Sequence, residues 1–199
     1  MTDEGEDDVR AAEMRHRAAN TFQLISALAR MRGQRTAEPE ARRQLVWMAD
    51  AIGALGALER HRRGSGVDFQ EYLLEMAPVW RRRQAAGPTE VVVAMEPVIA
   101  PDQAASTLAL IVHELVSNAL AHAYPEGQTG QIEVSLSRIE GGERYELVVR
   151  DHGCGFDPSS PGGRERFGLW FVRSLAAQVR GELKLETRDG VRAQLVFSL

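Results

Sequence analysis

The chain contains almost no lysine. Among its 24 basic residues only Lys184 is a lysine, and all the others are arginines. A Walker P-loop, the protein-kinase fold and a Schiff-base enzyme each require a lysine in a defined sequence context. Lys184 lies in none of these contexts, so the sequence excludes all three classes.

Cysteine, long apolar runs and excess positive charge are also missing. The single cysteine, Cys154, can form neither an internal disulfide nor a cysteine-based zinc site, which favours a reducing interior. No stretch approaches the roughly 18 apolar residues of a membrane span. Residues 2–8 are mostly acidic, unlike a signal peptide, and the net charge of −4 argues against a nucleic-acid partner. We therefore expect a cytoplasmic protein with no membrane insertion.

What is present is an ordinary globular composition over 199 residues, with 44% hydrophobic and 26% charged residues. The residue pattern changes at the arginine-rich stretch around residues 60–66. We therefore predict a helical hairpin in residues 1–65, with residues 1–8 disordered, and a second, α+β domain in residues 66–199.

The first part has the pattern of two amphipathic helices. Residues 9–32 place Met14, Ala18, Ile25 and Leu28 on one side of a helix, and His16 points away from that side. The second helix extends to about residue 62, and its apolar residues recur at steps of three and four: Ala41, Leu45, Met48, Ile52 and Leu55. Because one hairpin cannot bury both seams, we expect a homodimer that forms a four-helix bundle.

The second part mixes helices and strands. We predict helices over residues 68–83, 102–123 and 167–179, and strands over residues 89–95, 131–138, 145–150, 182–187 and 193–199. The last two strands form a hairpin across the turn at Asp189 and Gly190. This order predicts one mixed sheet that is covered by helices on one face.

Four groups of residues indicate chemistry, and the first surrounds His16. Asn20 lies one helical turn away on the same face, while Glu13 and Arg17 provide a carboxylate for the imidazole proton and a cation for a phosphoryl group. Neutral imidazole is a nucleophile near pH 7. A histidine of this kind taken alone is more often an ordinary surface residue.

The second group is Glu114 and Asn118, which are four residues apart and project together from the long helix. A carboxylate and an amide at a buried margin can hold Mg²⁺ with its waters, or they can simply hydrogen-bond each other. His113 and His122 are nine residues apart, on opposite sides of the helix, which argues against a shared metal site.

The third and fourth groups are rich in glycine. Asp151 ends a strand and is followed by Gly153 and Gly155, so the backbone can approach a flat ligand while the carboxylate accepts from an exocyclic amine. Gly168 and Leu169 open a helix, whose N-terminus can bind phosphate. In isolation the third group could be a hairpin turn and the fourth a plain loop-to-helix joint.

In this order the four groups resemble the core of a sensor histidine kinase. His16-Arg17-x-x-Asn20 resembles the H box of HRxxN (HWE-related) kinases, and Glu114-Leu115-x-x-Asn118-Ala119 resembles the N box. Asp151-x-Gly153-x-Gly155 resembles the G1 box, and Gly168-Leu169 the G2 region, of the GHKL ATP-binding fold. The resemblance covers nearly everything from Glu13 to Leu199, and chance hardly supplies all four boxes in sequence.

The resemblance implies a fold, cofactors and roles. The fold is a dimeric hairpin for histidine phosphotransfer followed by a GHKL-type α/β sandwich, and the cofactors are ATP and Mg²⁺. His16 is the phosphoacceptor, supported by Glu13, Arg17 and Asn20. Asn118 is the Mg²⁺ ligand, and Glu114 assists through metal-bound water. The remaining residues contact the nucleotide: His122, Asp151, Gly153, Gly155, Gly168 and Leu169.

The implied activity is autophosphorylation of His16 followed by transfer to an aspartate in the receiver domain of a response regulator, with a separate sensor protein as a further partner. Two departures favour an alternative, a histidine phosphotransferase without ATP turnover. Ala121 stands where many relatives have lysine, and the lid at residues 156–167 is short, although Arg164 and Arg166 supply positive charge there. A third alternative, an anti-sigma-type binding protein, does not need the outward His16.

Overall fold

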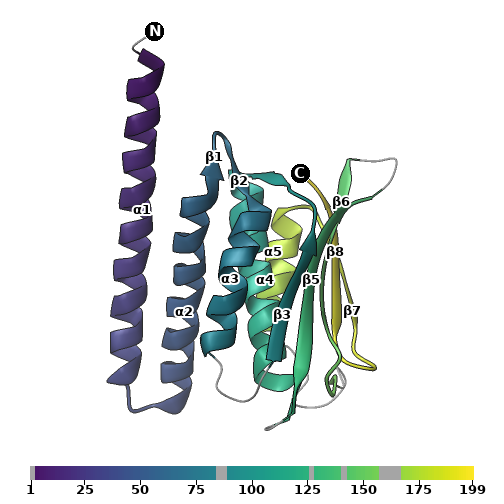
Figure 1. Cartoon of the computed structure of the whole chain (residues 1–199). Helices are drawn as coiled ribbons and strands as arrows, with labels where there is room; N and C mark the ends of the chain where they lie inside the picture. The colour runs from purple at the N-terminus through teal and green to yellow at the C-terminus, as the bar shows by residue number, and fades with distance from the viewer. Residues whose placement is uncertain (1–2, 84–88, 126–127, 140–142, 157–166) are drawn as a thin grey trace.

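The computed structural model of the chain describes residues 3–83, 89–125, 128–139, 143–156 and 167–199. It contains a helical hairpin, α1 (Asp3–Gln34) and α2 (Pro39–Leu58), which lies beside a mixed sheet with its own helices (Figure 1). The predicted α+β class and the order of the long elements are confirmed.

The two hairpin helices pack through small residues. Ala19, Ser26 and Gly33 of α1 are buried at successive seven-residue steps, and Ser26 Oγ donates to the backbone oxygen of Ala49 at 2.7 Å. A Cβ added to Gly56 would lie only 3.0 Å from the Cβ of Phe22. The small residues at these positions therefore let the two helices approach closely, and Gly56 leaves room for Phe22.

The larger apolar residues of α1 face elsewhere. Met14, Ile25 and Leu28 are 65%, 44% and 59% exposed, and Leu24 and Met31 are exposed as well. The apolar side that the sequence predicts is thus a stripe on the outside of the hairpin. One copy of the chain leaves it in contact with solvent.

Two boundaries in this region were predicted wrongly. Residues 3–8, expected to be disordered, are the first turns of α1, because acidic residues favour a helix N-terminus and no proline interrupts them. The second helix ends at Leu58, followed by a 3₁₀ turn (Glu59–His61) and the strands β1 (Arg62–Arg63) and β2 (Gly66–Asp68). Gly64 has φ of +58°, which allows the tight turn between these strands.

The main sheet has the strand order β3-β5-β6-β8-β7. Its strands are β3 (Thr89–Met95), β5 (Gly130–Arg138), β6 (Arg144–Asp151), β7 (Glu182–Glu186) and β8 (Arg192–Ser198). Only β3 and β5 run parallel to each other, and the other neighbours are antiparallel. The helices α3 (Phe69–Arg83), α4 (Asp102–His122) and α5 (Phe167–Gln178) cover one face, as predicted (Figure 1). A third short strand, β4 (Ile99–Pro101), pairs with β2.

The core forms where α4 crosses the sheet. Leu108, Ile111 and Val112 of α4 are fully buried, as are Ile132 and Val134 of β5. Within the described ranges α4 is the one helix long and apolar enough to cross a membrane, but 61% of its most apolar window is buried inside the protein. That burial is the pattern of a core helix.

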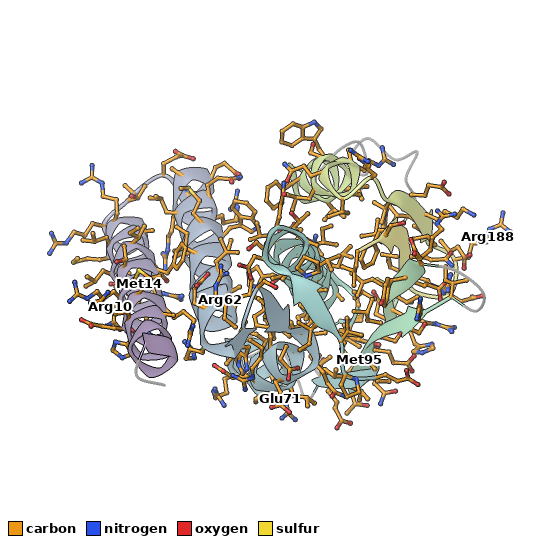
Figure 2. All side chains as sticks on the ribbon, turned by 90° about the horizontal axis from the view of Figure 1, so that it is seen from above. Arg10, Met14, Arg62, Glu71, Met95 and Arg188 are labelled. Carbon is orange, nitrogen blue, oxygen red and sulfur yellow. The ribbon has the colours of Figure 1, made fainter. Side chains whose placement is uncertain are left out.

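Ion pairs join the hairpin to the rest of the chain. His61 Nε2 lies 2.6 Å from Glu75 Oε2 on α3, and Arg60 pairs with the same carboxylate. Arg62 contacts Glu59 at 2.6 Å and also pairs with Asp102 at the start of α4. In Figure 2 Arg62 lies between the hairpin and the sheet-bearing part, with Arg10 and Arg188 at opposite ends of the molecule.

Candidate functional site

A pocket of about 140 Å³ lies beside the last two turns of α4. Five of its lining residues are among the predicted site residues: Asn118, His122, Asp151, Gly155 and Leu169. Apolar residues complete the walls: Leu115, Ala119, Ala123, Phe156, Leu185 and Val191. The fold therefore gathers residues far apart in the sequence around one concave surface of mixed polarity, as expected for a small-molecule site.

Asp151 is the last residue of β6 and is buried, with 4% of its surface exposed. Its Oδ1 accepts from the backbone N–H of Gly153 at 3.0 Å and of Val191 at 3.2 Å. These bonds commit Oδ1 to the loop and leave Oδ2 as the oxygen that can accept from a ligand amine. A flat base between apolar walls, with an amine at this carboxylate, fits the site.

The loop after Asp151 depends on glycine. A Cβ on Gly153 would lie 2.1 Å from the backbone oxygen of Ala123, and Gly155 has φ of +62°. The backbone N–H of Cys154 also donates to Ala123 O at 2.9 Å. The loop thus lies directly against the end of α4. A side chain in place of Gly153 would push the loop away from it.

Glu114 and Asn118 are in contact. Asn118 Nδ2 donates to Glu114 Oε1 at 2.8 Å. Asn118 lines the pocket, whereas Glu114 is only 4% exposed and is not among the lining residues. A Cβ on Gly168 would lie 1.7 Å from Glu114 Oε1, so the first turn of α5 rests directly on this carboxylate.

The donor set suits a magnesium ion held largely by a nucleotide. Within the described part of the chain, no three His, Cys, Asp or Glu side chains form a metal-binding cluster. Mg²⁺ commonly takes one or two protein ligands, with phosphate oxygens and waters completing its shell. The amide oxygen of Asn118 fits that requirement, and its role as a ligand stays a prediction.

Trp47 is a residue that the sequence reasoning missed. It stands on α2, yet its Nε1–H donates to Glu114 Oε2, and its indole packs edge-on against Phe171 with ring centroids 5.2 Å apart. The two residues are 67 positions apart in the sequence, and the apolar pattern of α2 does not indicate which element Trp47 contacts. The contact could therefore not be predicted from the sequence.

The first group, around His16, lies elsewhere. His16 is exposed on α1, and the amide nitrogen of Asn20 is 3.1 Å from its Nδ1. Glu13 and Arg17 pair with each other at 2.5 Å rather than with His16. Figures 1 and 2 show α2 lying between α1 and the other helices, so one copy of the chain does not bring His16 to the pocket.

Two further predictions concern the lid and Ala121. The lid residues Arg164 and Arg166 lie outside the described residues. Ala121 is exposed beside His122 at the end of α4. A larger hollow of about 420 Å³ between α1, α2 and α3 is lined by none of the predicted site residues.

Two family models match the chain. Residues 83–196, more than half of its length, match the model described as a histidine kinase-like ATPase domain, and residues 13–81 match a model described as histidine kinase. The chain belongs to the histidine kinase family. The second of these matches, to residues 13–81 of this histidine kinase core, extends into α3. Our predicted boundary at residue 65 assigns α3 to the second domain, and that boundary stays a prediction.

Relatives agree with the assignment of the kinase core. It is 26% identical over 195 residues to blue-light-activated histidine kinase 2 of Erythrobacter litoralis, covering 92% of this chain and 54% of the relative. It is 27% identical over 185 residues to the sensor histidine kinase PdtaS of Mycobacterium tuberculosis, covering 88% of this chain and 36% of that protein. The chain therefore spans about half or less of these relatives.

A solved structure agrees on the fold. The histidine kinase domain of the E. litoralis EL346 blue-light-activated kinase aligns with a TM-score of 0.68 at 22% identity, covering 98% of this chain and 93% of that one. At this identity the likeness concerns the fold. It confirms the predicted helical region followed by an ATPase-like sandwich.

Proposed function

We propose that the chain is the catalytic core of a two-component histidine kinase that phosphorylates His16 with Mg-ATP and passes the phosphoryl group to a response-regulator aspartate. One observation carries the proposal: residues of the predicted N, G1 and G2 groups line one pocket, in a chain whose first helix presents His16 to solvent. Membership of the kinase family supports the same conclusion.

Asp151 recognises the base. With Oδ1 held by the N–H groups of Gly153 and Val191, Oδ2 accepts from the exocyclic amine of adenine. A hydrogen bond to a charged acceptor contributes about 1.5–3 kcal/mol. Leu185 and Val191 supply apolar contact for the ring. Guanine has a carbonyl oxygen where adenine has its amine, so this carboxylate also favours ATP over GTP.

Asn118 and the start of α5 lie at the phosphate end of the site. Bound Mg²⁺ neutralises phosphate charge and helps to align the γ-phosphoryl group for in-line transfer. The amide of Asn118 provides the protein ligand, and Leu169 lines the pocket from the first turn of α5. The N-terminus of this twelve-residue helix supplies N–H groups and a partial positive charge.

His16 is the acceptor. Its Nε2 attacks the γ-phosphorus, the bond to the β–γ bridging oxygen breaks, and ADP leaves with the electron pair of that bond. For this attack the neutral ring must carry its proton on Nδ1, so that Nε2 has the free electron pair. Asn20 is in reach of Nδ1, and its amide accepts that proton's hydrogen bond when the carbonyl end faces the ring. Glu13 balances the charge of Arg17 until a phosphoryl group approaches.

The transfer requires a second arrangement of the parts, because α2 separates α1 from the nucleotide pocket in this one (Figure 1). We propose that two copies pair through the exposed apolar stripe of α1 to form a four-helix bundle, and that the nucleotide-binding part moves relative to it. A receiver domain docks at the exposed His16, and a separate sensor protein is a further proposed partner.

The test is incubation of the purified chain with Mg²⁺ and γ-labelled ATP. Wild type should acquire acid-labile label, His16→Gln should acquire none, and His152→Gln, which alters another exposed histidine, should keep it. Unlabelled wild type that accepts phosphate from a phosphorylated regulator would identify the phosphotransferase alternative, which Ala121 favours. Unlabelled protein that binds ATP and accepts no phosphate would point to the binding-protein alternative.

A further inference from the structure

Trp47 connects the histidine-bearing hairpin to the phosphate end of the nucleotide pocket. It belongs to α2, which packs against α4. Its Nε1–H donates to Glu114 Oε2, and its ring meets Phe171 of α5 at an interplanar angle of 84°. A residue from the first part of the chain therefore touches both helices that frame the phosphate end.

The contact continues to Asn118. Glu114 Oε2 accepts a hydrogen bond from the indole N–H of Trp47, and Glu114 Oε1 accepts one from Nδ2 of Asn118 at 2.8 Å. Because the nitrogen of Asn118 is committed to Glu114, its oxygen is the amide atom that can coordinate a cation. Trp47, Glu114 and Asn118 thus form a hydrogen-bonded relay that ends at a residue lining the pocket.

Burial makes each donor to Glu114 important. The carboxylate is 4% exposed, and the backbone of Gly168 lies against it. A buried carboxylate that loses a hydrogen-bond donor is strongly destabilised and reorients toward another donor. Without the indole N–H, Glu114 would therefore be expected to turn, and the amide of Asn118 would turn with it.

We propose that Trp47 is a positioning residue for Mg²⁺-nucleotide binding, which acts through Glu114 on the amide of Asn118. The inference rests on the proposed nucleotide site. It means that the docking of α2 against α4 and the binding of Mg-ATP are coupled. Movement of the hairpin that withdraws Trp47 weakens nucleotide binding, and by linkage Mg-ATP favours the docked hairpin.

The test uses the full chain and a fluorescent ATP analogue, with affinity measured in Mg²⁺ and again in EDTA. Trp47→Phe keeps an aromatic ring but removes the N–H. We expect its affinity in Mg²⁺ to fall by about tenfold, the equivalent of one charged hydrogen bond at the lower end of its range. Its affinity in EDTA should equal that of wild type, because base recognition by Asp151 is untouched.

Two further variants make the test specific. Trp80→Phe removes another buried indole N–H, which donates at 2.9 Å to His113 on the same helix α4, and it should not alter the Mg²⁺ dependence. Glu114→Gln offers one acceptor oxygen in place of two, so it should show the same Mg²⁺-specific loss. Adding Trp47→Phe to it should cost nothing further.

The outcomes separate the two levels of the proposal. Wild type that binds the analogue more tightly in Mg²⁺, with Trp47→Phe unchanged or equally weakened in both buffers, overturns the relay alone. Wild type that binds in neither buffer overturns the proposed function and the relay with it. Thermal unfolding without nucleotide shows whether Trp47→Phe is folded, and Glu114→Gln carries the test if it is not.

Discussion

The amide nitrogen of Asn20 lies 3.1 Å from Nδ1 of His16, one turn away on the exposed face of α1. This contact holds one nitrogen of an exposed imidazole ring. Asn20→Ala removes the contact, and loss of a hydrogen bond worth about 1 kcal/mol should slow phosphorylation of His16 by about fivefold. Single-turnover labelling with ATP measures the rate.

The affinity for ATP should not change in Asn20→Ala, because Asn20 lies outside the nucleotide pocket. Thr21→Ala is the matched control, since the hydroxyl of Thr21 bonds only to the backbone oxygen of Arg17 among the contacts seen here. An unchanged phosphorylation rate in Asn20→Ala would show that Asn20 does not assist His16 as the phosphoacceptor.

Asp151→Asn tests recognition of the base. The substitution replaces one carboxylate oxygen with an amide N–H₂, which cannot accept from adenine. ATP affinity should fall by about ten- to a hundredfold, and the preference for ATP over GTP should decrease, because an amide can donate to the guanine carbonyl. Competition binding measures both quantities. Asp189→Asn, at the exposed hairpin turn, should leave them unchanged.

The outer stripe of α1 should mediate self-association. Leu28 is 59% exposed between Ile25 and Met31, so Leu28→Glu places a charge in the proposed bundle without disturbing the contact between α1 and α2. Sedimentation should show a dimer for wild type and a monomer for Leu28→Glu. Leu74→Glu, at a position 47% exposed on α3, should remain dimeric. A monomeric wild type contradicts the proposed bundle.

Glu75 makes the junction between hairpin and sheet sensitive to acid. Burial alone would raise its pKa, but hydrogen bonds from Arg60 and His61 outweigh burial and hold the pKa below its ordinary value of 4.5. A lowered carboxylate pKa stabilises the fold above the unfolded value, and this stabilisation is lost as the pH falls through the folded value.

Glu75→Gln should therefore be less stable than wild type at neutral pH, and the difference should shrink once the pH falls below about 4.5. Chemical unfolding across this pH range measures the difference in the free energy of unfolding. Glu96→Gln, at an exposed carboxylate between β3 and β4, should follow wild type throughout. A constant difference for Glu75→Gln would show that its ionisation does not stabilise the junction.

Much of the fold could be predicted because long periodic segments determine their own structure. The strand Thr89–Met95 has the predicted bounds, and the ends of α4 differ by one residue at most. The pocket was predictable for a different reason: Asp151 and Gly155 stand at a strand end where backbone approach needs glycine. In the structure they meet Asn118 around the same pocket.

What escaped prediction depends on contacts that local patterns do not carry. The packing side of α1 is set by Ala19 and Ser26, whose small side chains give a weaker periodic pattern than Ile25 and Leu28. The strands β1, β2 and β4 are two or three residues long and have no periodicity. Trp47 reaches Glu114 only because the hairpin docks on α4.

The most direct test of the account is to locate the phosphate by mass spectrometry at neutral pH after incubation with Mg-ATP, in wild type and in Asn118→Ala. We predict phosphate on His16 in wild type and none in Asn118→Ala, which should still accept phosphate at His16 from a phosphorylated receiver domain. Phosphate on another residue of the wild type, or loss of both reactions in a folded Asn118→Ala, would contradict the division of roles between hairpin and pocket.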